Sequence, residues 1–425
     1  MTSTSPMAAA VHGSFALDDI HELTAALASL LEACDPPPKL LALGEPTHGE
    51  PAFPRLRNRI LRALVEHGFR SIAVETDQIA ALDADAFVRG GAGTLDQVMA
   101  EGFSHGFGQL DANRELVAWM RAYNQGRPAA EQLAFYGFDA PLETTSAPSP
   151  RRYLRHLHGY LTEHLGPDSF LHGHTDLERL LGDDEHWSDP AALTDAARSI
   201  GASTQATRLR AVTDDLLTTL HAQVPRLVAA SSMNDWQQAE MHGKAARGLL
   251  RYHAQLAEAT SPAARVSRLL AVRDTLMVEN IRAVRAREQH RGPTLLFAHN
   301  RHLQRNLSAV HLPDMDLEWF SAGAITATLL GDGYTFIASS LGTSAALGLH
   351  SPPVNTFEAA MHQAPYGCAL FDAHRLREAL GASARALHVR TDVRPEQGYF
   401  PLDAATLEHC DAVLHIASAS GHTAR

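Results

Sequence analysis

The stretch Leu40–Glu50 constrains the fold of this chain more than any other. Its short apolar run is typical of a buried strand and breaks at Gly44, after which Glu45 and His48 follow three residues apart. Open α/β folds present their reactive groups in this way, where parallel strands end at the carboxyl edge of the sheet. The stretch therefore predicts an α/β fold with a site at that edge.

Three further strands are predicted to end in polar or ionisable side chains. They are the short apolar runs Ser71–Glu75, Leu133–Phe138 and Thr294–Ala298. The residues that close them are Glu75, Asp139, and the sequence His299-Asn300-Arg301-His302. A helical pattern at 53–69 joins the strand that ends at Gly44 to Ser71–Glu75, so these two strands should be parallel with a right-handed connection. Because parallel strands end at one edge, we expect these side chains and the Glu45–His48 pair to converge in one crevice.

The middle of the chain has a different pattern. Between residues 151 and 289 the apolar spacing is helical and almost no strand signal occurs, and the segment 141–150 is rich in Pro, Ser and Thr, as linkers are. We predict a mostly parallel central sheet flanked by helices, with an inserted helical subdomain that forms a deep cleft. Residues 1–148 and 290–425 would form the α/β core, and 149–289 the insertion. Residues 1–16 are expected to be loose, and 342–366 to form a mobile loop.

Composition excludes several classes of protein. The net charge of −12 argues against a nucleic-acid or anionic-membrane surface. The cysteines (Cys34, Cys368 and Cys410) are odd in number and widely spaced, which indicates a reducing compartment rather than a disulfide framework. Met1–Phe15 lacks the features of a signal peptide, and no run approaches the roughly 20 apolar residues of a membrane span. We expect a cytoplasmic protein whose partner is a small molecule.

Two chemistries suit the convergent residues. In one, a histidine made more basic by a glutamate takes a proton from water, the water attacks an acyl carbon, and a second histidine or an arginine stabilises the oxyanion. In the other, Glu45, His48, Glu75 and His299 ligate a divalent metal that acidifies its bound water. The sequence leaves both open, so no cofactor is required but a metal is an alternative.

A serine nucleophile is the rival interpretation. The segment from Gly102 to Gly106 matches G-x-S-x-G, with Ser104 and His105 at its centre. A nucleophile elbow needs a strand immediately before the serine, whereas residues 95–101 have a helical pattern. We therefore predict a pocket loop that brings Ser104 and His105 to the site. Nucleotide-binding glycine motifs follow none of the predicted strands.

Two arginines are ambiguous from pattern alone. Arg57 lies on the helix that leaves the first strand, where it is either a surface residue or a partner for Glu75 or a substrate carbonyl. Arg273, followed by Asp274, opens the last helical stretch before the His299 strand and allows the same two interpretations.

These motifs resemble the erythromycin esterase family in order and spacing. The resemblance rests on segments spread over nearly the whole chain: Gly44–Gly49, the helix with Arg57, Gly68–Glu75, Trp119–Asn124, Tyr136–Asp139, Arg273–Asn280 and Ala298–His302. The resemblance implies a mixed α/β core with a helical portion over a large cleft, and hydrolysis of a macrolide lactone without a serine nucleophile. By position it assigns function to Glu45, His48, Arg57, Glu75 and His299, with Arg273 and His302 as secondary candidates. Pro46 departs from the small residue expected there and would rigidify the loop.

Three hypotheses follow. The first is a serine-independent ester hydrolase acting on a bulky macrolide- or polyketide-like natural product, with His48 or His299 as the base, Glu45 and Glu75 orienting it, and Arg57 polarising the acyl group. The second is a biosynthetic tailoring enzyme that uses the same groups for cyclisation, elimination or acyl transfer. The third is a binding protein that keeps the cleft without turnover. Asp139, Asn300, Ser104 and His105 are expected to support the site.

Overall fold

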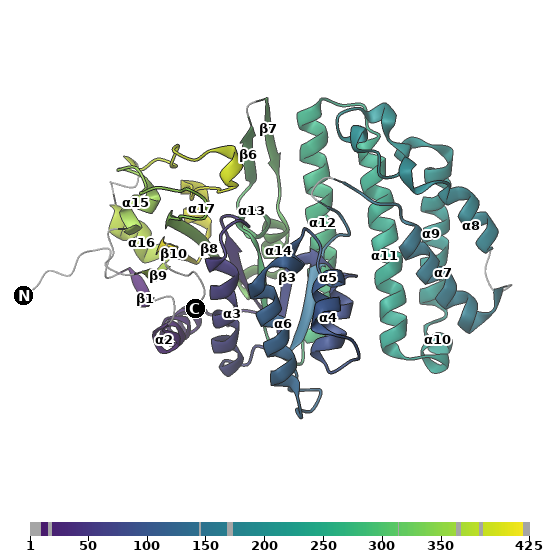
Figure 1. Cartoon of the computed structure of the whole chain (residues 1–425), viewed down its shortest axis with the longest axis horizontal. Helices are drawn as coiled ribbons and strands as arrows, with labels where there is room; N and C mark the ends of the chain where they lie inside the picture. Colours follow the sequence, from purple (N-terminus) through teal and green to yellow (C-terminus); the bar gives the residue numbers. More distant parts are fainter. Residues whose placement is uncertain are drawn as a thin grey trace, which may run out of the picture.

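The computed structural model describes residues 10–15, 19–143, 146–167, 173–312, 314–362, 367–381 and 386–419. They form a mixed α/β fold around an eight-stranded sheet in the order β1-β9-β10-β8-β2-β5-β3-β4. Helices flank the sheet, and a bundle of long helices stands beside it, at the right in Figure 1. The predicted fold class is confirmed.

The sheet is mostly parallel. Every neighbouring pair from β10 to β4 is parallel, whereas β9 pairs antiparallel with both β10 and β1 at the other end. The strand bounds are β1 Val11–Phe15, β2 Leu40–Glu45, β3 Ser71–Asp77, β4 Ala134–Asp139, β5 Thr294–His299, β8 Tyr334–Thr343, β9 Cys368–Asp372 and β10 Ala412–Ser418. β2, β3 and β5 are buried along their whole length, as expected of parallel strands covered on both faces.

Strand order places β5 between β2 and β3. The sequence predicts that β2 and β3 are parallel, and the structure confirms it. The two strands do not pair with each other, however, because β5, which comes much later in the sequence, lies between them and pairs with both. Its register sets Glu45 opposite His299. The ends of the three strands that carry the candidate residues are therefore immediate neighbours.

Helices cover both faces of the sheet. On α3, for example, Phe53, Leu56, Ile60 and Leu64 recur at helical spacing and are buried in the core. The helices outside the central segment are α2 Ile20–Ala33, α3 Ala52–Glu66, α4 Ala81–Val88, α5 Leu95–Glu101, α6 Asp111–Asn124, α13 Asn300–Leu303, α14 Ala322–Leu330, α15 Phe357–His362, α16 Ala373–Leu380 and α17 Ala404–His409.

The central segment is helical wherever it is described. Its helices are α7 Arg151–Leu165, α8 His174–Leu181, α9 Thr204–Ala222, α10 Val224–Ala230, α11 Met233–Leu256 and α12 Pro262–Glu288, with short 3-10 turns between α8 and α9. They share a hydrophobic cluster of their own, to which α7, α9 and α11 contribute most. α12 also contacts β4 and so joins this bundle to the sheet (Figure 1). The boundaries that we propose for the insertion, 149 and 289, fall just outside α7 and α12.

Some elements differ from the prediction. Residues 11–15 of the stretch expected to be loose form β1, which pairs antiparallel with β9, while residues 1–9 and 16–18 lie outside the described part. The expected loop at 342–366 contains the end of β8 and helix α15, and residues 363–366 are not described. β9 and the hairpin of β6 (Ser308–Leu312) and β7 (Met315–Trp319), which projects at the top of Figure 1, were not expected. Among the described helices, none is long and apolar enough to cross a membrane.

Candidate active site

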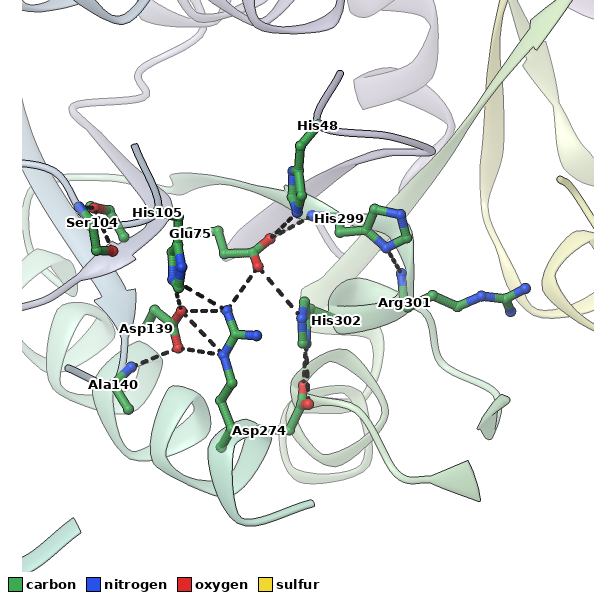
Figure 2. A network of polar contacts seen from close by, with 12 residues as sticks. His48, Glu75, Ser104, His105, Asp139, Ala140, Asp274, His299, Arg301 and His302 are labelled. Carbon is green, nitrogen blue, oxygen red and sulfur yellow. Dashed lines mark hydrogen bonds and ion pairs between the residues drawn. The ribbon is translucent and has the colours of Figure 1, made fainter. Parts of the chain in front are cut away.

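The predicted residues meet at the carboxyl edge of β2, β5 and β3. Glu45 lies opposite His299 in the sheet register, and the backbone N–H of His299 donates to Glu75 Oε2 at 2.8 Å. The imidazole rings of His48 and His299 are 5.3 Å apart, centroid to centroid. Figure 2 shows the side chains of His48 and His302 pointing toward Glu75, whose carboxylate also accepts the backbone N–H of His299.

His48 is held between two buried carboxylates. Its Nδ1 lies 2.8 Å from Glu45 Oε1, and its Nε2 lies 3.8 Å from Glu75 Oε2. The His48 side chain is 38% exposed, whereas Glu45 and Glu75 are 7% and 5% exposed. Burial alone would lower the pKa of His48, but the charge of Glu75 and the hydrogen bond to Glu45 raise it to about 9. Burial outweighs the opposing effect of His48 on Glu45 and raises the pKa of that carboxyl.

Glu75 is the hub of the network in Figure 2. Its Oε1 lies 3.1 Å from Arg273 Nη2 and 3.5 Å from His302 Nε2. Burial alone would raise the pKa of Glu75, but the charges of His302, His48 and Arg273 hold it well below its usual range. Glu75 is therefore an anion, suited to stabilising a cation beside it and unsuited to donating a proton.

Two buried pairs support this hub from the outside. Arg273 forms a two-pronged ion pair with Asp139, at 3.0 Å from Nε and 2.5 Å from Nη2, and His105 Nε2 lies 2.8 Å from the same carboxylate. On the other side, His302 Nδ1 lies 3.0 Å from Asp274 Oδ1. Burial opposes the charged form of His302, yet Asp274 and Glu75 raise its pKa. Asp274 was recognised in the sequence only as a neighbour of Arg273.

His299 has the opposite character from His48. Its Nδ1 accepts the backbone N–H of Arg301 at 3.2 Å, so the neutral imidazole carries its proton on Nε2. That Nε2 is buried and has no hydrogen-bond partner among the described residues. Burial and the neighbouring charge of His48 hold the pKa of His299 well below its usual range. The ring of Phe400 packs edge-on against it at 4.8 Å. His299 is thus a neutral imidazole whose Nε2–H can donate a hydrogen bond that no described residue accepts.

Arg57 does not pair with Glu75, which corrects one of the two sequence-based alternatives. Among the described residues, Arg273 is the arginine bonded to Glu75, because α12 rather than α3 passes beside the end of β3. Arg57 is 2% exposed, donates to Asn58 Oδ1 through Nε and Nη2, and lies over the ring of Phe297. Burial lowers its pKa to about 10. Arg57 also lines a small cavity with Glu45, His48 and Glu75, so it belongs to the site.

Ser104 is a structural residue of the loop that bears His105. Its hydroxyl accepts the backbone N–H of Asp77 at 2.9 Å and lies 3.1 Å from Thr76 Oγ1. The neighbouring His105 has a left-handed backbone, with φ of 57°, and points to Asp139 rather than to the serine (Figure 2). The preceding element is helix α5, as predicted, so the geometry of a nucleophile elbow is not met.

Asn300 fastens the site to the sheet. Its side chain exchanges two hydrogen bonds with the backbone of Ser339 on β8, at 2.8 and 3.1 Å. A Cβ added at Gly44 would lie 2.1 Å from Asn300 Oδ1, which explains the glycine before Glu45. Asn300 therefore positions β5 rather than facing a substrate.

Sequence reasoning missed three side chains that contact the predicted set. Phe107 packs on His48 at 5.1 Å, Phe400 packs on His299, and Asn113 lines the cavity beside His48. Phe107 begins a short 3-10 helix, Phe400 lies on an irregular segment, and Asn113 lies within helix α6. Their sequence patterns contain no signal that relates them to the strand ends.

The donor geometry does not fit a metal centre. Among the described residues, no three His, Cys, Asp or Glu side chains are disposed to hold one ion. Glu75, the central carboxylate, is already bonded to a guanidinium and a backbone N–H. A second cation there would be repelled by Arg273, so we derive no step through a metal.

Cavities near these residues differ greatly in size. The space lined by Glu45, His48, Arg57 and Glu75 has a volume of about 20 Å³. A cavity of about 800 Å³ lies between α4 and β4 on one side and α11 and α12 on the other, at the junction of the sheet and the helical bundle. None of the residues that line the small cavity lines the large one.

Fold and site together define an α/β protein with a cluster of ionisable side chains at the carboxyl edge of its sheet. The chain belongs to the erythromycin esterase family, whose model matches residues 64–419 and thus includes Glu75, Asp139, Arg273 and His299. Family membership suggests ester hydrolase activity. No curated protein matches this chain in sequence.

Solved structures share the fold over nearly the whole chain. A Bacillus cereus protein is 17% identical with a TM-score of 0.68 (96% of this chain, 95% of that one). A succinoglycan biosynthesis protein is 17% identical with a TM-score of 0.66 (97% and 95%). A mutant of the erythromycin esterase EreC in its open conformation is 20% identical with a TM-score of 0.65 (96% and 97%). At these identities the likeness shows the fold.

Proposed function

We propose that this protein is a serine-independent ester hydrolase that opens the lactone of a bulky macrolide- or polyketide-like natural product. The observation that carries the proposal is the placement of His48. Its Nδ1 is held by Glu45, while its Nε2 forms no hydrogen bond within the described part of the chain. A histidine held in this way has one nitrogen oriented and the other available to a water molecule.

The residues divide the reaction between them. His48 Nε2 takes a proton from water, the water oxygen attacks the acyl carbon, and the same proton passes to the departing alkoxide when the carbon–oxygen bond breaks. Glu45 holds the imidazole through Nδ1, and the anion of Glu75 stabilises the imidazolium that forms. With a pKa of about 9, the neutral base is on the order of one part in a hundred at pH 7 but is a strong base when it forms.

The oxyanion needs donors, and we assign this role to His299. Its buried Nε2–H lacks an acceptor among the described residues, and its low pKa keeps it neutral. Such an imidazole donates to a developing oxyanion without adding a formal charge to the ground state. The guanidinium of Arg57 adds positive charge to the cavity beside His48, and it is close enough to Glu45 to lower the pKa of that carboxyl.

The substrate class rests on the family and on the fold. The family is named for erythromycin hydrolysis, and the EreC structure shares the fold from end to end. We propose a macrolide-type lactone as substrate, a role in macrolide inactivation, and action in the cytoplasm, with no nucleic-acid or membrane partner.

The test is ring opening in oxygen-18 water. Purified protein is incubated with erythromycin and a panel of other macrolide lactones, and products are analysed by mass spectrometry. Hydrolysis places one labelled oxygen in the product acid. Absence of turnover on the whole panel by folded protein would refute the proposal, and tight binding without turnover would favour a binding protein.

A second candidate is a biosynthetic tailoring enzyme with non-hydrolytic acid–base chemistry. One observation favours it: a protein with the same fold over 97% of this chain is described as acting in succinoglycan biosynthesis. The His48 pair moves a proton whether or not water is the nucleophile. In the same experiment, product formation without incorporated label would select this candidate.

A further inference from the structure

The cavity beside His48 has the size of a single water molecule. Its volume of about 20 Å³ exceeds the roughly 10–15 Å³ that one water requires. A water in such a cavity also needs polar partners. The polar lining residues are Glu45, His48, Arg57, Glu75 and Asn113, and the others are Pro54, Val74, Phe107, Leu110, Phe297 and Ala298.

Asn113 supplies the observation that points to an occupant. It lies in the first turns of α6, is 3% exposed, and uses its Nδ2 to donate to the carbonyl oxygen of Phe107 at 2.9 Å. Its Oδ1 is buried and has no hydrogen-bond partner among the described residues. Buried side-chain oxygens are nearly always bonded to protein or to ordered water, so this oxygen requires a donor.

Arg57 provides the complementary group. Its Nε and Nη2 both bond Asn58 Oδ1, and no carboxylate of the described residues lies within ion-pair distance of the guanidinium. An arginine donates only, and Asn113 Oδ1 accepts only. A water accepting from Arg57 and donating to Asn113 would satisfy both and still have a second proton to give.

From this arrangement we propose that the cavity holds the hydrolytic water, and that Asn113 fixes its position and excludes larger nucleophiles. The inference rests on the proposed ester hydrolysis and extends it. One water proton bonds Asn113 Oδ1 and the other goes to His48 Nε2 as the oxygen attacks the acyl carbon. The proton then returns to the leaving alkoxide, so no other reactant is needed.

Asn113 also forms the wall that limits the nucleophile. Through Phe107 it holds the ring that packs against His48, at 5.1 Å between centroids. Because the cavity is filled by one water, methanol should compete poorly for the acyl group in the native enzyme. The choice between water and methanol therefore reports on this cavity and not on overall stability.

The experiment compares two substitutions of the same residue. Asn113→Ala removes the hydrogen bond and adds volume, whereas Asn113→Leu removes the hydrogen bond and keeps the volume. The enzymes are given erythromycin in water–methanol mixtures, and the ratio of methyl ester to acid is measured by mass spectrometry. Methanol is water enlarged by one methylene, a difference that a close-fitting site discriminates by about 10- to 200-fold.

The two variants should differ in a specific way. Asn113→Ala should raise the ester-to-acid ratio by about 10-fold or more, because methanol now fits. Asn113→Leu should lower kcat by about 100-fold without raising that ratio, because the water loses the bond that positions it and the cavity gains no space for methanol. Both variants lose the bond to Phe107, so a loosened loop alone would raise the ratio in both.

Asn124→Ala is the matched control. Asn124 lies at the other end of α6, is also 3% exposed, and also bonds backbone carbonyls, those of Val88 and Leu133. Its substitution should leave the product ratio at the native value. Asn113→Ser, which is polar and smaller than asparagine, replaces the alanine variant if that protein does not fold, and should raise the ratio in the same direction.

The outcomes separate this inference from the proposed function. If the native enzyme hydrolyses the lactone but the ratio stays unchanged in folded Asn113→Ala, or rises equally in Asn113→Leu, the role of Asn113 is refuted and hydrolysis stands. If the native enzyme makes no labelled acid in oxygen-18 water, the proposed function itself fails.

Discussion

The end of β2 and the end of β5 lie side by side, and each presents a histidine to the same site. His48 has a carboxylate near each ring nitrogen, and its pKa is raised to about 9. His299 has a backbone N–H at one nitrogen and no partner at the other among the described residues, and its pKa is depressed. Two identical side chains a few ångströms apart are therefore biased toward opposite protonation states.

The difference shows that neighbours, not position in the fold, decide the role of each histidine. Negative charge around His48 raises its proton affinity, as the proposed base requires, whereas burial keeps His299 neutral, as the proposed hydrogen-bond donor requires. Glu75 touches both residues, since one of its oxygens faces His48 and also accepts the backbone N–H of His299, but its charge raises the pKa of both histidines, and only at His299 does burial outweigh it. The following predictions test this division of roles.

The largest effect is expected from removing the base. His48→Ala should lower kcat by about 10² to 10⁴-fold, the usual contribution of a positioned acid–base group. His221→Ala is a matched control, because His221 is also partly exposed and lies 2.9 Å from Glu240, away from the site. Steady-state kinetics on a macrolide lactone measure both. Near-native turnover of folded His48→Ala would refute the assignment of His48 as the base.

A smaller loss is expected from removing the neutral donor. His299→Asn should lower kcat by about 10² to 10³-fold, as loss of one oxyanion donor does. The rise of kcat/KM with increasing pH should persist in this variant, because we assign that rise to deprotonation of His48. If the rise disappears while the protein remains folded, His299 is the base and the assigned roles are reversed.

The pH profile itself gives a graded effect. A base must be unprotonated, so kcat/KM should rise with pH by about tenfold per unit below the pKa of His48 and level off near pH 9. Glu45 favours the charged imidazole, so Glu45→Gln should move this limb to lower pH. An unchanged limb would show that Glu45 does not control His48.

The smallest effect is expected at Ser104. Ser104→Ala should leave kcat near the native value and lower the free energy of unfolding by about 1 kcal/mol, since it removes the bond to the backbone of Asp77. Urea unfolding and steady-state kinetics measure the two quantities. Loss of turnover with an intact fold would restore the serine as a candidate nucleophile.

Local patterns predicted much of the fold because they depend on neighbours in sequence. Apolar runs that stop at a polar residue marked β2, β3, β4 and β5, and helical spacing marked the long helices of the central segment. Elements stabilised mainly by distant partners were missed. β1 is a short strand with a glycine at its centre that pairs with β9, some 360 residues later, so its own residues give little indication of a strand.

The site divides in the same way. That Glu45, His48, Glu75 and His299 share one edge follows from the rule that parallel strands end together. Which arginine would meet Glu75 did not follow, because it depends on whether α3 or α12 passes the end of β3, and the structure selects Arg273 on α12. Asn113 was not predicted, because what marks it is a buried oxygen that has no hydrogen-bond partner among the described residues, and only tertiary packing shows this.

The sequence by itself determined an α/β sheet whose strands end in acid–base residues, because strand length and polarity are local properties. Only the tertiary structure decided that β5 lies between β2 and β3, that His48 is flanked by two carboxylates, and that His299 is buried and neutral. The physical reason is that the pKa of a side chain depends on the charges and water around it. Those surroundings are assembled from segments more than 200 residues apart.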